Sequence, residues 1–376
     1  MDWAAWRAEF PILARKTYLN SCSLGALPLR AEAWLRTFLD EWHDRGAAGW
    51  YDTWLARLDE LRGRVARLIG AQQQEVALAA SISAALTAVA SAIDYTRRPR
   101  VVVSDLDFPT LAYQWMVRPD VDVVQIRSEG AATIDPARFA EVVDDRTAVL
   151  AASHVYFTTG AIQDLRALAD IAHAHGALLI VDGYQGTGQV PQDVRAADVD
   201  VLLTGTLKWL LGGPGLAYLY VREELIERLH PTVAGWFGAD AQFGFDATAL
   251  QLRDDARRFE LGTPALAAVH TALGGMEIIE EIGVPAIRER CSMLTERLVA
   301  AARDAGFRLR VADDPERRSA IVMIAQDDPA AAVAHLAAHG IIVDWRPGHV
   351  RVSPYFYNTE EEVDSVVETL ARWSGR

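Results

Sequence analysis

Two hydrophobic periodicities divide the chain. Between residues 28 and 70, apolar side chains recur at helical spacing among Arg, Asp and Glu, which predicts a helical segment. From about residue 75, short apolar runs of strand length alternate with amphipathic stretches; the strand candidates are 101–103, 121–124, 148–151, 177–182, 199–203 and 216–221. This alternation predicts an α/β fold with a mainly parallel sheet covered by helices on both faces. The functional site should then lie at the carboxyl ends of the strands.

A second change in the pattern, near residue 260, indicates a smaller region. Amphipathic helices are predicted over 264–282 and 285–305, and shorter strands and helices then alternate up to a final helix over 360–373. The length of 376 residues suits two or three domains. We therefore expect an N-terminal arm over 1–20, a large α/β domain over 21–258 and a small α+β domain over 259–376.

Composition and charge narrow the classes of function. The chain has 37 basic and 51 acidic residues, a net charge of −14, which argues against nucleic acid or an anionic membrane as the main partner. It contains no uncharged apolar run long enough for a membrane span, and its start lacks the pattern of a secretory signal. Two cysteines, Cys22 and Cys291, suit a reducing cytoplasm. No HExxH or CxxC motif is present, so we expect no metal site.

Two segments carry the candidate chemistry. The strand candidate 177–182 ends in Asp182 and is followed by a Gly-rich stretch. About one strand later, Lys208 lies between hydroxyl residues and a Gly-rich turn over 212–215. Pyridoxal phosphate needs a Lys for its aldehyde and a carboxylate for its pyridine nitrogen. Alone, Asp182 could be a helix cap and Lys208 a surface residue; together with the glycines and hydroxyls, they favour a site for this cofactor.

These segments resemble the pyridoxal-phosphate-dependent class V aminotransferase superfamily, which includes cysteine desulfurases, kynureninases and isopenicillin epimerase-like proteins. The resemblance extends from residues 18–28 to residues 357–363. It implies the fold type I architecture, with a large domain built on a seven-stranded type of sheet and a smaller C-terminal α+β domain. It also implies a homodimer with shared active sites.

The resemblance further implies roles for single residues. Lys208 would form the Schiff base with the cofactor and then move protons at the substrate Cα, while Asp182 would pair with the pyridine nitrogen. Other cofactor contacts would come from the start of a helix near residues 80–83 and from positions further along the chain: Ile82, Ser83, Phe108, Gln185, Thr206 and Thr263. Of these, Phe108 would stack on the ring, and Thr263 would reach the phosphate of the neighbouring subunit.

Three residues would contact the substrate. Arg351 would bind its α-carboxylate in a bidentate fork, and Trp236 and Asn20 would line the pocket. Without the resemblance, Arg351 is as readily a surface strand residue and Trp236 a core aromatic.

The reaction is harder to predict than the cofactor. Cysteine desulfurases use a loop Cys, and the matching region 340–351 has none, which argues against persulfide chemistry. The kynureninase pattern is the closest, but Leu207 stands where those enzymes carry Tyr, and Gln185 where they carry His. We therefore expect a Cβ-elimination lyase, similar to C–S lyases, acting on an L-α-amino acid. An aminotransferase, a kynureninase-like hydrolase, an epimerase and a pyridoxal-phosphate-binding protein without catalysis stay open as alternatives.

Overall fold

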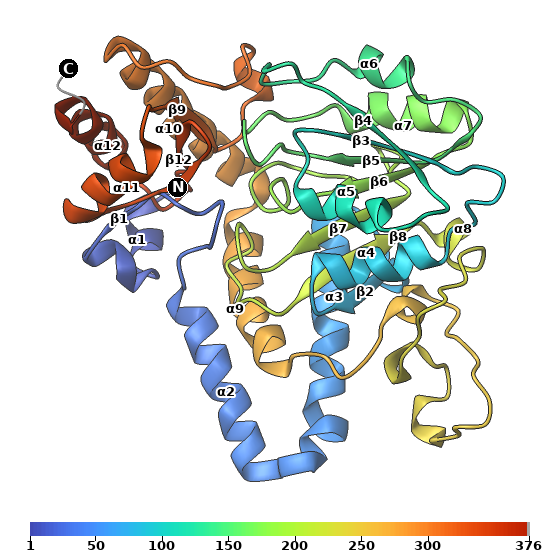
Figure 1. Ribbon diagram of the computed structural model, residues 1–376. Coiled ribbons are helices and arrows are strands. Elements are labelled where there is room, and N and C mark those ends of the chain that lie inside the picture. The colour runs from blue at the N-terminus through green and yellow to red at the C-terminus, as the bar shows by residue number, and fades with distance from the viewer. Residues whose placement is uncertain (374–376) are drawn as a thin grey trace.

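A seven-stranded sheet forms the centre of the computed structural model, which describes residues 1–373 (Figure 1). Its strand order is β2-β8-β7-β6-β5-β3-β4. Strands β3 to β7 are parallel to one another, whereas β8 is antiparallel to both β2 and β7. The strands are Val76–Ala79 (β2), Arg100–Ser104 (β3), Asp122–Ile126 (β4), Thr147–Ser153 (β5), Leu178–Asp182 (β6), Val201–Gly205 (β7) and Ala217–Val221 (β8). The prediction of a mainly parallel sheet is confirmed.

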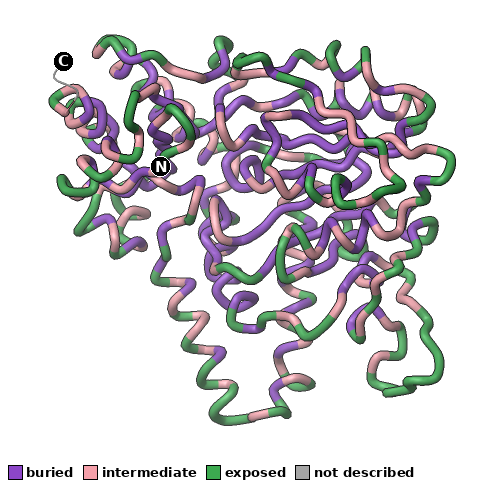
Figure 2. Tube along the Cα trace, in the orientation of Figure 1, coloured by how far each residue is buried: buried purple, intermediate pink, exposed green. Residues whose placement is uncertain are grey.

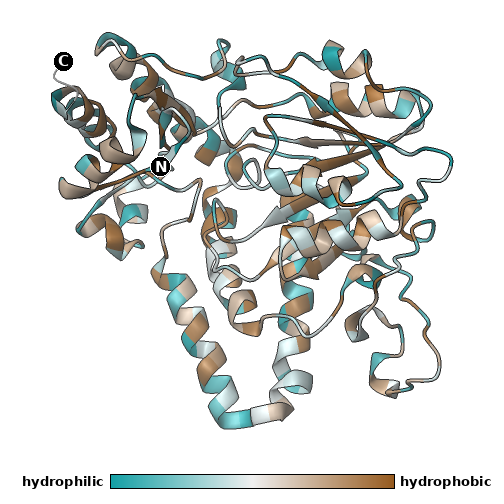
Figure 3. Ribbon diagram, in the orientation of Figure 1, coloured by the Kyte–Doolittle hydropathy of each residue, from teal (hydrophilic) through white to brown (hydrophobic). Residues whose placement is uncertain are grey.

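Helices cover both faces of this sheet. The strands are apolar and mostly buried (Figures 2 and 3), and their alternate side chains enter two separate cores. In β5, for example, Leu150 and Ala152 pack with one core, and Val149 and Ala151 with the other. The first core includes α3 (Leu55–Ile69), α7 (Leu165–Ala174) and α9 (Leu266–Ile282); the second includes α4 (Ile82–Ser91), α5 (Pro109–Met116) and α8 (Glu223–Ile226). A short helix, α6 (Pro136–Ala140), precedes β5.

The C-terminal region has a small antiparallel sheet in the order β11-β12-β9, with bounds Asp344–Arg346, His349–Val352 and Val322–Ala325. Its helices are α10 (Val284–Asp304), α11 (Pro329–Ala338) and α12 (Glu360–Trp373). The N-terminal segment, which begins with α1 (Trp3–Arg7), lies against this region. There, β1 (Thr17–Tyr18) pairs in parallel with β10 (Ile341–Ile342), and Arg7 forms an ion pair with Glu362. Residues 1–20 are thus fixed to the C-terminal region.

The helical segment predicted over 28–70 is interrupted. It forms α2 (Leu29–Arg45) and α3, joined by a turn and a π-helical stretch, Trp50–Trp54. Gly46 has φ +52°, a conformation that favours glycine, and ends α2. The two helices therefore run in opposite directions and project from the body of the molecule (Figure 1), and each packs against α9. No helix among residues 1–373 is long and apolar enough to cross a membrane.

Glycines allow three backbone segments to meet beside Lys208. A Cβ atom on Gly275 of α9 would lie 2.3 Å from the carbonyl oxygen of Leu210, and one on Gly25 would lie 2.2 Å from that of Lys208. On the adjacent position of α9, a Cβ on Gly274 would lie 2.6 Å from the amide nitrogen of Ala31 in α2. These contacts hold the turn that carries Lys208 between the N-terminal segment and α9.

We expect Gly275→Ala to destabilise the protein by about 1–3 kcal/mol, because the new methyl group meets main chain that cannot move aside cheaply. Gly63→Ala, in helix α3, is the matched control: its Cβ would meet only the ends of two long side chains, Gln73 at 3.1 Å and Arg67 at 3.6 Å. This control should change stability by no more than about 1 kcal/mol, and in the stabilising direction, because Ala favours helices. Urea unfolding measures both variants, and equal stabilities would contradict the close approach.

Candidate active site

A cavity of about 310 Å³ lies at the carboxyl ends of the parallel strands. Ser153, the last residue of β5, and Asp182, the last residue of β6, line it. Lys208, three residues beyond the end of β7, also lines it, as do residues 81–83 at the start of α4. The structure therefore brings Asp182 and Lys208 together at the sheet edge where the strand pattern predicted a site.

Burial shapes the charges of both residues. Asp182 is only 7% exposed, and burial raises the pKa of its carboxyl group, although a hydrogen bond from the Tyr184 amide (2.9 Å) and the charge of Lys208 oppose the rise. Burial also lowers the pKa of Lys208 to about 8, against the opposing effect of Asp182. A sizeable fraction of the Lys208 amine is consequently neutral near physiological pH, which makes it a nucleophile for an aldehyde.

Two aromatic rings lie close to the Lys208 amine. Its Nζ atom is 4.2 Å from the ring centroid of Tyr184 and 5.9 Å from that of Phe108. Gly205 makes room for Tyr184, since a Cβ at Gly205 would lie 1.9 Å from the tyrosine ring. Phe157 also lines the cavity, and its ring meets that of Phe108 edge to face at 5.1 Å. Phe108 thus lines the same cavity as Lys208, and its stacking on the cofactor ring stays a prediction.

Tyr184 and Phe157 were missed by the sequence interpretation. A signal for Tyr184 was present, because it follows the strand-ending Asp182 by two residues and so had to lie near the same edge. Phe157 had no comparable signal: it lies in a loop beyond β5, and only the tertiary structure brings it to the cavity.

The start of α4 offers an anion site. Ser81 caps the helix, its Oγ accepting a hydrogen bond from the Ala84 amide (3.2 Å), so Ser83 is not the cap. Both Ile82 and Ser83 line the cavity, and Ser83 is exposed. The N-terminal turn of a ten-residue helix therefore points its partial positive charge at the cavity that holds Lys208.

Of the predicted cofactor contacts Gln185 and Thr206, only Gln185 lines the cavity. The Gln185 amide donates to the Cys22 carbonyl and accepts from the Trp209 ring nitrogen, both at 2.9 Å. Thr206 is fully buried, and its hydroxyl is engaged by the carbonyl oxygens of Gly213 and Leu216. Thr206 therefore holds the Gly-rich turn together and is not brought to the cavity wall.

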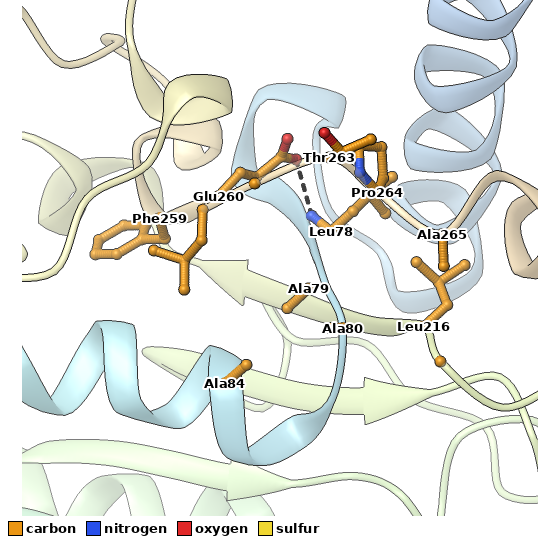
Figure 4. Close-up of a pocket in the computed structure, with 13 residues that line it drawn as sticks. Leu78, Ala79, Ala80, Ala84, Leu216, Phe259, Glu260, Thr263, Pro264 and Ala265 are labelled. Carbon is orange, nitrogen blue, oxygen red and sulfur yellow. Dashed lines mark hydrogen bonds between the residues drawn. The ribbon is translucent and has the colours of Figure 1, made fainter.

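Thr263 lies in a neighbouring cavity of about 330 Å³ (Figure 4). This second cavity shares Ala80, Gly215 and Leu216 with the first. Its wall is held by Glu260, which accepts a hydrogen bond from the Leu78 amide (2.9 Å). Thr263 itself is exposed, beside but outside the cavity of Lys208.

The predicted substrate contacts are spread more widely. Trp236 is 42% exposed, stacks on Phe245 and lines a different cavity. Asn20 forms a β-bridge with Ser353. Arg351 is only 1% exposed; it lies behind Phe157, whose carbonyl accepts a hydrogen bond from Arg351 Nη1 (3.1 Å). Within the chain, none of these three lines the cavity of Lys208.

The residues of the cavity fit pyridoxal phosphate. They supply a lysine amine, a buried carboxylate, an aromatic ring face and a helix N-terminus for a phosphate. Residues 45–366 match the family model described as Aminotransferase class-V. The chain belongs to the class V aminotransferase family. It is an enzyme of this family, and its cofactor is pyridoxal phosphate.

The names of similar proteins indicate several different reactions. An uncharacterized aminotransferase, YcbU of Bacillus subtilis, is 34% identical over 97% of this chain and 96% of its own length. A kynureninase of Bacillus anthracis is 30% identical over 98% and 90%. Among solved structures, an apo cysteine desulfurase of Thermococcus onnurineus has a TM-score of 0.88 at 21% identity, covering 98% of each chain. A C-DES variant with glycine covalently linked to its PLP cofactor has a TM-score of 0.89 at 20% identity, over 97% and 98%. These structures confirm the fold.

Competitive labelling tests the charge state of Lys208. We expect reductive methylation of Lys208 in the cofactor-free protein to rise with pH through a midpoint at about 8, read by mass spectrometry. The sequence has one other lysine, the exposed Lys16, which serves as internal reference. In Asp182→Asn the midpoint should fall, because the carboxylate that stabilises the ammonium form is gone. An identical midpoint in that variant would contradict the coupling of the two groups.

Proposed function

We propose that the enzyme is a Cβ-elimination lyase acting on an L-α-amino acid with a leaving group at Cβ. One molecule of substrate and one of water would give a 2-oxo acid, ammonia and the protonated leaving group. Bound pyridoxal phosphate supplies an electron sink for the charge that develops at Cα. The residues of the chain then have to bind the substrate, take up the Cα proton and exclude competing chemistry.

Lys208 is the base in this proposal. Its lowered pKa keeps part of the amine free of a proton, and its place among Tyr184, Phe108 and Asp182 confines it to one region of the cavity. Such an amine can accept the Cα proton and return it later. Asp182 holds the negative charge that a protonated pyridine nitrogen needs, and Arg351 binds the α-carboxylate.

The apolar wall next to Lys208 is the observation that favours elimination over hydrolysis. This part of the cavity wall is formed by Leu207, Val155 and Phe157, whose side chains have no acidic or basic group. Hydrolysis of a carbon–carbon bond, as in kynureninases, needs a group that moves protons on the carbonyl side of the substrate, and Leu207 offers none. A leaving group that departs as a stable anion, such as a thiolate, needs no such help. Both cysteines are buried, Cys291 within α10, which fits elimination without a persulfide.

An aminotransferase is the second candidate, because the relative with 34% identity carries that name. It would use the same proton transfers by Lys208 but would pass the amino group to a second 2-oxo acid instead of releasing ammonia.

We also propose that the enzyme is a homodimer. Thr263 is exposed at the edge of a cavity that adjoins the cofactor site, and Trp236 is exposed as well. A second copy covering this side would bring such residues to the site of its partner, as the family resemblance implies.

Product analysis tests the reaction. With single L-amino acids, S-substituted cysteines among them, we expect 2-oxo acid and ammonia in equal amounts without any added acceptor. The Lys208→Arg variant should lose this activity by at least about a thousandfold, whereas Lys16→Arg should keep it. A 2-oxo acid that forms without ammonia, and continues only when another 2-oxo acid is added, would show an aminotransferase instead.

A further inference from the structure

A cluster of three charged side chains lies behind the wall of the cavity. Arg351 Nη2 is 2.7 Å from Asp344 Oδ2, and Arg346 Nη1 is 2.8 Å from the same oxygen. Ser23 donates a third hydrogen bond to this oxygen (2.8 Å) and accepts one from Arg351 (2.8 Å). Two guanidinium charges therefore share one carboxylate, and the cluster carries one uncompensated positive charge.

The backbone fixes this arrangement. Asp344 and Arg351 face each other in the antiparallel pair β11–β12, and Arg346 lies on the same strand as Asp344, two residues on. Side chains two apart on a strand point to the same face, so Arg346 and Asp344 reach the same partners. Burial raises the pKa of Asp344, but the Ser23 hydrogen bond and the two guanidinium charges outweigh it and hold the pKa below its usual range.

The cluster borders the cavity through Phe157. This residue lines the cavity, its carbonyl accepts from Arg351 (3.1 Å), and its ring centroid is 5.9 Å from the guanidinium carbon of Arg346. The charges of both arginines also contribute to the lowered pKa of Lys208. The positive cluster is therefore close enough to act on an anion bound beside Lys208.

One nitrogen of the Arg351 guanidinium group has no hydrogen-bond partner in the described part of the chain. Its Nη1 and Nη2 atoms have partners in the chain, but its Nε has none among residues 1–373, although the side chain is 99% buried. A buried guanidinium N–H without a partner is costly, and a ligand oxygen would satisfy it.

We propose that Asp344 neutralises one of the two positive charges of the Arg346–Arg351 pair, so that this pair can bind only one carboxylate of the substrate. The enzyme then selects amino acids without an acidic side chain. This rests on the proposed role of Arg351 in binding the α-carboxylate. One substrate carboxylate brings the charge of the cluster from +1 to zero. A second would leave an unpaired negative charge beside Asp344, which disfavours dicarboxylic amino acids.

The test uses the holoenzyme and two probes without an amino group, propionate and succinate, at constant ionic strength. Dissociation constants come from the change that each probe causes in the visible absorbance of the bound cofactor. In the unmodified enzyme we expect propionate to bind more tightly than succinate. In Asp344→Asn, succinate should bind at least about tenfold more tightly than before, and propionate should gain less.

Asp364→Asn is the matched control. Asp364 pairs with Arg297 on the surface of α12, so this variant makes the same change of charge away from the cluster and should keep the ratio of the two constants. Arg346→Gln removes one of the two cations, and propionate should then bind about tenfold more weakly. Retention of the visible band shows that each variant is folded and loaded.

An unchanged propionate-to-succinate ratio in Asp344→Asn would overturn the inference. If both probes then bind more weakly by the same factor, Asp344 only holds Arg351 in place. The proposed role of Arg351 is tested separately by Arg351→Lys. If that variant binds propionate as well as the unmodified enzyme does, the carboxylate site lies elsewhere. If it loses propionate while Asp344→Asn leaves the ratio unchanged, only the role of Asp344 is wrong.

Discussion

The burial of a lysine amine beside a buried carboxylate is the constraint on which the site depends. Asp182 ends β6, and Lys208 lies three residues beyond the end of the neighbouring parallel strand β7, where both side chains are largely withdrawn from water. Burial makes the ammonium form of Lys208 less stable, whereas the carboxylate opposes this effect and limits the fall of the pKa to about 8. The pair can therefore bind an aldehyde and a protonated ring nitrogen, which neither group could do equally well in water.

The rest of the structure keeps the lysine in that position. The turn after Lys208 is held between Gly25 and Gly275, at distances that only glycine permits. Gly25 belongs to the N-terminal segment, which also pairs with the C-terminal region through β1 and β10. The Lys208 turn is thus fixed by segments from both ends of the chain, and the Asp344 cluster of the C-terminal region is brought behind the same cavity. This geometry links the cofactor site to the residues that we propose select the substrate.

Much of the fold could be predicted from the sequence, because strands buried on both faces are continuous apolar runs and the helices between them are amphipathic. Asp182 and Lys208 could be predicted for the same reason, since Asp182 ends such a run and Lys208 lies three residues beyond the end of the next strand. The interruption of the helix at Gly46 was not predicted, because a glycine in a helical pattern does not by itself show where the chain turns. Neither was the partnership of Asp344, Arg346 and Ser23 with Arg351. It depends on the register of β11 against β12 and on the packing of the N-terminal segment, which brings Ser23 to residues more than 320 positions away in the sequence.

Trapping of the cofactor tests the central role of Lys208 most directly. The protein reconstituted with pyridoxal phosphate is reduced with borohydride, digested and analysed by mass spectrometry. Only two lysines, Lys16 and Lys208, can carry the reduced adduct, so the assignment is unambiguous. We expect an absorbance band above about 400 nm before reduction and the adduct on Lys208, with both lost in Lys208→Arg and kept in Lys16→Arg. An adduct confined to Lys16, or no band at all, would contradict the assignment of this cavity as the active site.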